Sequence, residues 1–568
     1  MDNPTPMRNE VPAYPCKEDR DGSSEGFLSP PKGLLILIGL ILLWVYGYRI
    51  CENPLRWEES RRCLVACEMI YRGDYIVPRV MGEPYRNKPP LQNWLVILLG
   101  GNRANRVCPL PLRGLSLLAI LGTSLFLYAL GRRKTSGDMN WLPILMYLTM
   151  GVVVQDGRTG EIDPLFTFWV VGAVTCFEIG RQRQRPWLQW FLSQIMVAGG
   201  ILTKGLAPLY FYPPVLFFAW KDRSRTPFSA KAFLAGLTVE VLVVCAWLIP
   251  YAYRSSVTSL GMRWKQQVLT RTSFTGGTEE FLIHLVRFPA ETLGNLLPWS
   301  ALLLLWILPS VWRPLWALLQ RDSSIKLLFV FSFCWVFPVF WLIPGGIPRY
   351  LHPALPFVAV LLAHTLKISL PLFSGPKCPD PGNRVLHRIL FHKWTGWITL
   401  VTLWTITLLL VKTRGRDVPV LEPLVVGVLA ASVACYGLRV AGREKRLFWI
   451  LLLPALLYSV FYAGITSVYT LEKHSRILRD AQAIASQMDR PLPLVVDSDV
   501  DRDLCYYISR ELDRLVQIAA PAHGSYYRVS RSGSENARLG MLRGGAGDYL
   551  LLEIVAAPPV DADVRGER

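Results

Sequence analysis

Apolar runs long enough to cross a membrane recur along this chain, and they limit what it can fold into. Nearly all of the runs hold about 17 to 24 residues, the length at which an α-helix spans a hydrocarbon core of roughly 30 Å. The sequence therefore predicts an α-helical polytopic membrane protein with about thirteen transmembrane helices. The predicted spans are residues 33–50, 112–131, 139–155, 163–180, 186–202, 206–220, 230–252, 294–311, 325–344, 350–366, 393–411, 422–440 and 446–469.

Composition supports a membrane protein and argues against nucleic acid as a partner. Hydrophobic residues make up 52% of the chain and charged residues only 18%, which is far more apolar than a soluble chain of this length needs. The formal net charge of +19 comes from short clusters of Lys and Arg between the apolar runs. Membrane topology and anionic lipid explain such clusters, so no nucleic-acid partner is expected.

The remaining segments divide the chain into three predicted parts. Residues 1–31 are polar and rich in Pro, Ser and mixed charge, which is typical of a disordered tail, here expected in the cytoplasm. Residues 32–469 form the predicted transmembrane domain. Beyond residue 470, LPLVVDSDV, DLCYYISRELDRLV and YLLLEIVAAP follow the patterns of strand, helix and strand. Residues 470–568 are therefore expected to form a small soluble α/β domain outside the cytoplasm.

The distribution of Lys and Arg predicts which connections face the cytoplasm. Basic clusters occupy alternate connections, at 132–134, 181–185, 221–225, 313–321, 367–393 and 439–446, and the positive-inside tendency puts these in the cytoplasm. The outward set is then 51–111, 156–163, 203–205, 253–293, 345–349, 412–421 and everything after 470. The apolar piece 94–101 is too short to span and is expected to be an interfacial helix.

The outward loop 51–111 is the candidate catalytic loop. It is basic although it faces outward, which suggests that its cations are kept for a ligand rather than for topology. Acidic, basic and aromatic side chains are mixed in it, as in sites for anionic, polyhydroxylated ligands. They include Glu58, Glu59, Glu68, Asp74, Glu83, Arg56, Arg61, Arg62, Arg72, Arg79, Arg86, Lys88, Trp57, Tyr71, Tyr75, Tyr85 and Trp94.

Ionisable residues also stand at the outward ends of several spans. Asp163 opens the span at 163–180, Lys204 ends the run ILTK, and Arg349 precedes Tyr350 in IPRYLHP. Alone, Asp163 fits a helix-start carboxylate favoured by the helix dipole, and Lys204 fits a lysine that reaches to the membrane interface. Together with the loop they favour a site that clamps a phosphate with Lys or Arg and sets a carboxylate near a reacting group.

No cofactor is assigned from the sequence. Cys63 and Cys67 would lie one helical turn apart, but nothing else with metal-ligand spacing accompanies them, so neither zinc nor a disulfide is assigned. A pair of acidic residues fits a divalent metal site as well as a sugar-binding site, so a divalent metal ion stays an open alternative.

Several motifs between about residues 50 and 370 resemble a known enzyme family. They are WEESRRCLVACEM, RGDYIVPRVMGEPYRNKPPLQNW, RTGEIDPLFTFW, GILTKGLAPL, NLLPW and GIPRYLHPALPF. They are similar to the GT-C membrane glycosyltransferases of the branch related to protein O-mannosyltransferases, which includes the undecaprenyl-phosphate aminoarabinose transferases of lipid A. The pattern EM-x₃-GD-x₃-P-x₃-G-x₂-Y-x₂-KPP is long and specific, whereas TKG and LPW alone are weak.

The resemblance implies a site on the non-cytoplasmic face of the inner membrane that takes a sugar from a polyprenyl-phosphate carrier. Glu58 stands where the family usually has Asp, and the extra methylene moves the carboxylate by roughly 1.5 Å, so the adjacent Glu59 is the alternative. Asp163 is expected at the second acidic position of this site. For the lipid phosphate the resemblance implies Lys88, Tyr85 and Tyr350, and the positive charges of Arg349, Lys204 and Arg61 make these residues further candidates.

The chemistry implied is direct displacement of the lipid phosphate, with inversion at the anomeric carbon. The acceptor is a cell-envelope molecule such as lipid A or another glycolipid. One alternative is a protein O-mannosyltransferase-like enzyme acting on Ser or Thr of exported proteins. A second is a transporter of lipid-linked sugars, which predicts charges at mid-span, whereas here they stand at the outward ends of spans.

Overall fold

The computed structural model describes residues 32–55, 58–132, 138–222, 228–272, 277–374, 421–440, 446–521, 525–532, 541–543 and 549–556. The predicted tail 1–31 and the predicted span 393–411 lie outside the described residues. Most of the described chain is helical, and its strands are confined to one hairpin and one sheet.

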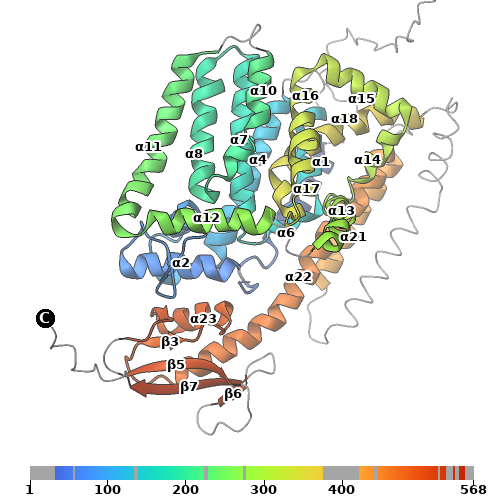
Figure 1. Cartoon of the computed structure of the whole chain (residues 1–568). Helices are drawn as coiled ribbons and strands as arrows, with labels where there is room; N and C mark the ends of the chain where they lie inside the picture. The colour runs from blue at the N-terminus through green and yellow to red at the C-terminus, as the bar shows by residue number, and fades with distance from the viewer. Residues whose placement is uncertain are drawn as a thin grey trace, which may run out of the picture.

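Two groups of helices differ in orientation. The first is the bundle, in which most helices stand side by side (Figure 1). It consists of α1 (Lys32–Gly47), α4 (Pro109–Gly131), α5 (Asp138–Leu148), α6 (Gly151–Gly157), α7 (Ile162–Gln182), the π-helical η2 (Trp187–Leu192), α8 (Ser193–Lys204), α9 (Ala207–Tyr210), α10 (Pro213–Lys221), α11 (Ala230–Arg254), α14 (Ala301–Leu304), η3 (Leu305–Ile307), α15 (Pro309–Arg321), α16 (Ser323–Phe329), the π-helical η4 (Val330–Val336), α17 (Phe337–Leu342), η5 (Pro348–Ala354), α18 (Leu355–Ser374), α21 (Leu421–Val440) and α22 (Arg446–Ser486).

The second group, α2 (Glu58–Arg72), α3 (Leu91–Leu99), η1 (Ala104–Arg106), α12 (Val257–Thr272) and α13 (Gly277–Asn295), belongs to the predicted outward connections. Figure 1 shows α12 lying across the end of the upright helices and α2 beyond it. We call this end of the bundle the loop end. Residues 94–99 of the predicted interfacial helix 94–101 belong to α3, which ends at Leu99.

Six helices in the described residues are long and apolar enough to cross a membrane, and a pair bent by 94° at Pro309 makes up to seven. The six are Pro109–Gly131, Ile162–Gln182, Ala230–Arg254, Ser323–Leu342, Pro348–Leu370 and Glu422–Arg439. Shorter apolar helices occupy Lys32–Gly47, Met139–Leu148 and Phe448–Gly464. Each predicted span that is described contains helix, so a polytopic helical membrane protein is confirmed, while the number thirteen stays a prediction.

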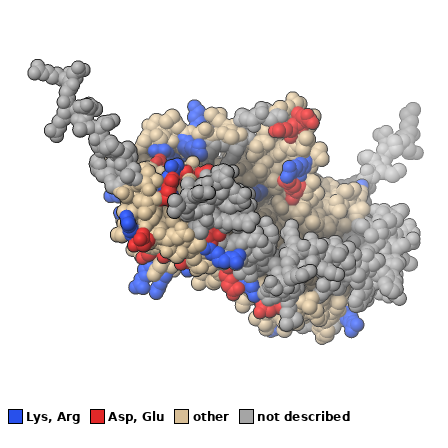
Figure 2. Space-filling model, turned by 90° about the horizontal axis from the view of Figure 1, so that it is seen from below, with Lys and Arg blue, Asp and Glu red and all other residues tan. Residues whose placement is uncertain are grey.

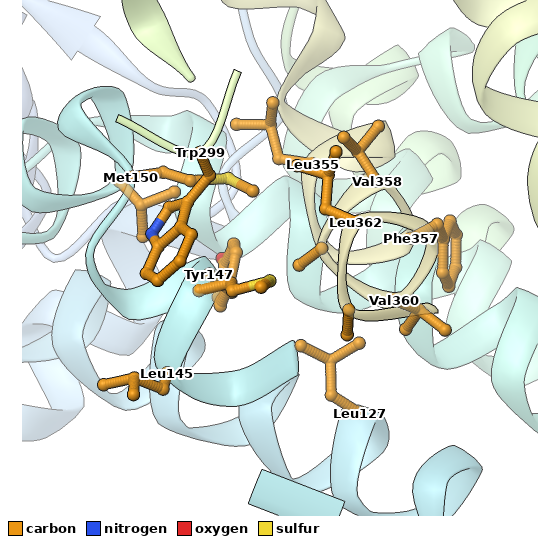
Figure 3. Close-up of a cluster of buried hydrophobic side chains, with 14 of the residues drawn as sticks. Leu127, Leu145, Tyr147, Met150, Trp299, Leu355, Phe357, Val358, Val360 and Leu362 are labelled. Carbon is orange, nitrogen blue, oxygen red and sulfur yellow. The ribbon is translucent and has the colours of Figure 1, made fainter. Parts of the chain in front are cut away.

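The buried centre of the bundle is apolar and includes the tryptophan of the NLLPW motif. Trp299 is fully buried, and Figure 3 shows its ring beside Met150 and Tyr147, facing side chains of α18. The indole Nε1 of Trp299 donates a hydrogen bond of 2.8 Å to Oγ1 of Thr149. A buried indole N–H needs such an acceptor. This motif therefore holds the start of the α14 segment against the α5–α6 junction.

Some spans are buried inside the bundle, whereas others expose an apolar face of the kind that contacts lipid. The apolar window of α7 is 83% buried, whereas that of α11 is only 22% buried. Large apolar side chains such as Leu234, Val241 and Leu242 are exposed on α11. In a bilayer such a face meets lipid rather than water. Helix α7 is therefore an internal helix, and this position makes its first turn suitable for holding a buried site.

A mixed sheet lies beyond the loop end. Its order is β4-β3-β5-β7-β6, with β3 (Leu494–Val496) parallel to β4 (Val516–Gln517) and β5 (Ser525–Ser532), and with β7 (Tyr549–Ala556) antiparallel to β5 and β6 (Met541–Arg543). Helix α23 (Arg502–Leu512) lies between this sheet and α2 (Figure 1). The strand, helix and strand expected from the sequence correspond to β3, α23 and β7.

The sheet shares a hydrophobic core with the loop end. Cys63, Val65 and Met69 of α2 belong to the same buried cluster as Leu504 of α23 and Val529 of β5. The predicted boundary at residue 470 falls inside α22, which runs without a break to Ser486 and carries the chain from the bundle to the sheet. Seen from the sheet side, the visible basic and acidic side chains are interspersed (Figure 2).

Candidate functional site

Three of the predicted site residues meet at the loop end of the bundle. The carboxylate of Asp163 is 2% exposed, and each of its oxygens accepts from a different cation. Lys204 Nζ donates to Oδ1 over 2.6 Å, and Arg349 Nε donates to Oδ2 over 2.5 Å. Residues from α7, α8 and η5 are thus joined at one buried carboxylate, as the convergence of the outward connections predicted.

Local structure explains why each of these residues stands at the end of a helix. Asp163 lies in the first turn of α7, followed by Pro164, and a carboxylate there is favoured by the helix dipole. Lys204 is the last residue of α8, where a cation is favoured. Gly205 follows with a φ of 67°, which glycine adopts without strain, and it ends the helix. The two oppositely charged helix ends therefore face each other.

Aromatic rings surround the amine of Lys204. Its Nζ lies 4.8 Å from the ring centroid of Phe166 and 5.7 Å from that of Tyr350. Both distances are within the range of cation–π attraction. The ring of Tyr350 in turn packs against Phe340, with centroids 5.3 Å apart. Tyr350 therefore joins the site through its ring face, next to the Lys204–Asp163 pair.

A second acidic residue, Glu161, was not selected from the sequence although it stands in the RTGEIDPLF motif. Its carboxylate pairs with Nη2 of Arg349, so this guanidinium bridges two carboxylates. Burial raises the pKa of Glu161, and the nearby guanidinium groups of Arg349 and Arg62 oppose that rise. Only the close approach of η5 to the α6–α7 connection shows that Glu161 belongs to this cluster.

The adjacent residues Glu58 and Glu59 lie in very different surroundings. Glu59 is buried, and its two oxygens accept from Nε and Nη2 of Arg113 over 2.8 and 3.0 Å. It also accepts from the backbone N of Gly160 over 2.7 Å. Arg113 itself donates to three backbone carbonyls at residues 50, 53 and 54. Glu59 therefore ties α2 to α4 and to the α6–α7 connection.

Glu58, by contrast, keeps 34% of its side chain exposed at the start of α2. Its Oε1 lies 2.7 Å from Nη1 of Arg61, and its Oε2 lies 3.8 Å from Nη2 of Arg62. Arg61 is mostly buried, with 19% of its side chain exposed. The structure thus provides one accessible carboxylate with two guanidinium groups beside it.

A chain of hydrogen bonds connects the Glu58 region to the Asp163 region. Arg62 Nη1 donates to Oε1 of Gln92 over 2.6 Å, and Nε2 of Gln92 donates to the carbonyl of Gly160 over 3.2 Å. A Cβ added at Gly160 would lie 2.2 Å from the side chain of Leu112, so only glycine fits there. The α6–α7 connection is therefore held between α2 and α4, and Glu161 and Asp163 follow it directly.

The segment with Tyr85 and Lys88 is placed by α12, a helix that sequence reasoning did not identify within the connection 253–293. Trp264 Nε1 donates to the carbonyl of Arg86 over 3.1 Å, and the same indole ring lies against Gly205, which follows Lys204. Lys88 and Tyr85 are half-buried. Trp264 thus brings the Lys88 segment and the Lys204 helix end to the same side of the site.

Among the described residues, the acidic side chains of the site are paired with cations rather than grouped around a metal position. In the described ranges no three His, Cys, Asp or Glu side chains are arranged to hold a metal ion. Asp163 and Glu161 are paired with Lys204 and Arg349 instead. What the arrangement offers is a set of fixed cations and one half-exposed carboxylate, which suits the binding and departure of a phosphate group.

Comparison with known proteins shows what this chain is similar to in sequence and in fold. A family model described as dolichyl-phosphate-mannose-protein mannosyltransferase matches residues 87–249. The undecaprenyl phosphate-alpha-4-amino-4-deoxy-L-arabinose arabinosyl transferase of Pseudomonas aeruginosa (strain UCBPP-PA14) is 27% identical over 369 residues, which are 62% of either chain. This chain resembles the aminoarabinosyl transferases. The enzyme of the same name from Edwardsiella ictaluri is 26% identical over 57% of this chain and 58% of its own length.

Solved structures show the same fold. ArnT from Cupriavidus metallidurans bound to undecaprenyl phosphate has a TM-score of 0.69 at 15% sequence identity, covering 93% of this chain and all of that one. Its apo state gives a TM-score of 0.62. The resemblance expected from the motifs is thereby confirmed, and the helical fold is shared. The match to the curated relatives extends over less than two thirds of their length.

Proposed function

We propose that this protein is a membrane glycosyltransferase that moves 4-amino-4-deoxy-L-arabinose from undecaprenyl phosphate to lipid A or a related envelope glycolipid, with inversion. The observation that carries the proposal is the buried Asp163, which holds Lys204 and Arg349 at the loop end. The accessible Glu58 is connected to this end through Arg62 and Gln92. The sequence likeness to aminoarabinosyl transferases supplies the sugar and the carrier.

In this proposal the residues divide into three tasks. Arg349, Lys204, Lys88 and Arg61, with Tyr85 and Tyr350, bind the lipid phosphate and stabilise its charge as the glycosidic bond breaks. Asp163 keeps two of these cations in place, because both of its oxygens are already occupied by them. Glu58 orients the acceptor or accepts its proton, since its carboxylate is accessible. Glu59 serves the structure rather than the reaction.

The proposed location is the inner membrane, with the loop end on its periplasmic side. The bundle would cross the membrane with about thirteen spans, which include the shorter apolar helices and the predicted span 393–411. The C-terminal sheet then forms a soluble α/β unit above the site. The exposed apolar face of α11 supports a lipid environment for the bundle.

The direct test is transfer by the purified protein in lipid nanodiscs, with undecaprenyl phosphate-aminoarabinose as donor, lipid A as acceptor, and mass spectrometry of the product. Glu58→Gln and Lys88→Ala should each abolish transfer. Glu279→Gln and Lys265→Ala are the matched controls, because both side chains are exposed and lie outside the site. Wild-type turnover in both site variants would contradict the assignment of these residues.

The family model that matches residues 87–249 supports a second candidate, a protein O-mannosyltransferase-like enzyme. This enzyme would transfer mannose from a polyprenyl-phosphate carrier to Ser or Thr of an exported protein. Offering the purified protein a mannosyl donor with a Ser/Thr-rich peptide, in parallel with the aminoarabinose donor and lipid A, separates the two candidates. Transfer in only one of the two reactions decides between them.

A further inference from the structure

A buried group of three side chains lies directly behind the Asp163 cluster. His352, on η5, is 1% exposed; its Nε2 lies 3.2 Å from Oδ2 of Asp156 at the end of α6. Its Nδ1 lies 3.2 Å from Oγ1 of Thr167 on α7. Asp156 and Thr167 are also buried. The Thr167 contact is a hydrogen bond, whereas the Asp156 contact is an ion-pair distance without hydrogen-bond geometry. The buried imidazole is thus confined between two polar groups, one on each ring nitrogen.

The sequence spacing connects this group to the site. His352 follows Arg349 by three residues on the same short helix, and Thr167 follows Asp163 by four residues, one turn along α7. Helices η5 and α7 are thus joined by two neighbouring contacts, Arg349 with Asp163 and His352 with Thr167. Loss of the second contact would leave η5 joined to α7 by Arg349 alone, through its pairs with Asp163 and with Glu161 just before α7.

The charges of the cluster support the same role. Asp156, Glu161 and Asp163 bring three carboxylates close to the two cations Lys204 and Arg349. With His352 in contact, the carboxylate of Asp156 has its own partner. Asp156 also adds to the negative charge that favours the Arg349 cation, so His352 contacts the same group of charges that holds Arg349.

A carboxylate, a histidine and a hydroxyl in this order also form the nucleophilic sites of hydrolases, but Thr167 cannot act as such a nucleophile. The hydroxyl of a nucleophile must reach the substrate. Thr167 is completely buried and lies one turn deeper in the bundle than Asp163. Contact with substrate is therefore excluded for Thr167, and the group can act only through the residues that it supports.

We propose that His352, held between Asp156 and Thr167, is a positioning residue that fixes Arg349 for the departing lipid phosphate. This inference rests on the proposed function, because it assigns the phosphate to Arg349. The charge on a departing phosphate grows in the transition state, so a misdirected Arg349 lowers kcat more than it raises the KM for the donor.

Thr167→Val tests the proposal with the least disturbance, because valine keeps the shape and removes the hydroxyl. Thr175→Val is the matched control: Thr175 is buried two turns further along α7, and its Oγ1 makes no hydrogen bond within the described residues. Steady-state transfer from undecaprenyl phosphate-aminoarabinose to lipid A should show kcat about tenfold lower in Thr167→Val, with the KM for the donor within about twofold. Thr175→Val should match the wild type.

Two substitutions of His352 provide the second measurement. His352→Ala should lower kcat about a hundredfold, because small misplacements of a positioned group have effects of this size. His352→Gln can still donate from its amide to Asp156, so it should recover part of that loss. Gel filtration in detergent shows whether each variant is folded. If His352→Ala aggregates, the Thr167→Val measurement decides the question alone.

The outcomes separate this inference from the proposed function. Equal kcat in Thr167→Val and Thr175→Val overturns the role of His352, and so does a rise in donor KM at unchanged kcat. A wild-type enzyme that transfers nothing from this donor overturns the proposed function, and with it the phosphate-binding role of Arg349.

Discussion

Neutralising Glu58 and Glu59 separately should have opposite consequences, although the two residues are adjacent. Glu59→Gln keeps the shape of the side chain but leaves Arg113 buried without its counter-charge. Breaking a buried pair in this way costs about 3–5 kcal/mol. The amide oxygen of glutamine can still accept from the backbone N of Gly160, as the carboxylate does over 2.7 Å. We therefore expect a loss at the lower end, about 3 kcal/mol.

The same change at Glu58 removes an ion pair with Arg61 in which Glu58 is 34% exposed. Partly exposed pairs of this kind contribute at most about 1 kcal/mol. We therefore expect Glu58→Gln to remain folded while it loses transfer activity. Each purified variant would be heated in detergent, the fraction remaining monodisperse measured by gel filtration, and turnover measured at a temperature where every variant is folded.

A double variant makes the test of Glu59 more specific. Replacing Glu59 and Arg113 together by Gln and Met removes both charges, which restores stability at many buried pairs. Here it should not, because the carbonyls at residues 50, 53 and 54 lose the donors that Arg113 supplies. A stable but inactive Glu59→Gln together with an active Glu58→Gln would refute the assignment of the two residues.

Three further predictions concern the surroundings of the site. Burial raises the pKa of Glu161 above its usual 4.5. The folded protein therefore binds this proton more tightly than the unfolded chain, so the stabilisation is complete below about pH 4.5 and is lost as pH rises through the raised pKa. Thermal melts between about pH 4 and pH 7 should show this loss in the wild type and not in Glu161→Gln. Ser60→Ala removes a 2.6 Å hydrogen bond to the buried Asp503 and should lower the free energy of unfolding by about 2 kcal/mol, seen as a lower melting temperature. In a cysteine-free background, Glu83→Cys should react with an impermeant maleimide from the periplasm and Arg321→Cys only after lysis, whereas the reverse pattern would refute the proposed orientation.

How far the sequence predicts this molecule depends on the range of the interactions involved. Span positions follow from local apolar length, and the meeting of Asp163, Lys204 and Arg349 follows from their common place at outward helix ends. Glu161 and His352 were missed, because their roles depend on how η5 approaches α6 and α7, which no local pattern encodes. The different environments of neighbouring glutamates are equally invisible, since the side chain that distinguishes them lies on α4.

The C-terminal sheet explains how a charged helix can be held at the membrane surface. One face of α2 carries Glu58, Arg61 and Arg62 toward the site, so that face cannot supply apolar packing. Distant residues hold this helix and the segment before it: Ser60 donates to Asp503, and just before α2 the backbone N of Leu55 donates to the hydroxyl of Tyr507 over 3.2 Å.

The hairpin that follows α2, made of β1 (Arg79–Val80) and β2 (Glu83–Pro84), is held as well, because the backbone N of Ile518 donates to the carbonyl of Met81 in its turn over 3.0 Å. Both attachments come from residues more than 400 positions along the chain. Burial of Cys63 and Met69 in the same cluster adds the apolar part. The charged face of α2 supplies no apolar packing, so the helix depends on its other face for stability. That packing comes from the sheet domain, and α2 can therefore present its carboxylate and guanidinium groups only while the sheet is in place. The sheet is thus part of the site's framework, even though none of its residues is assigned to the reaction.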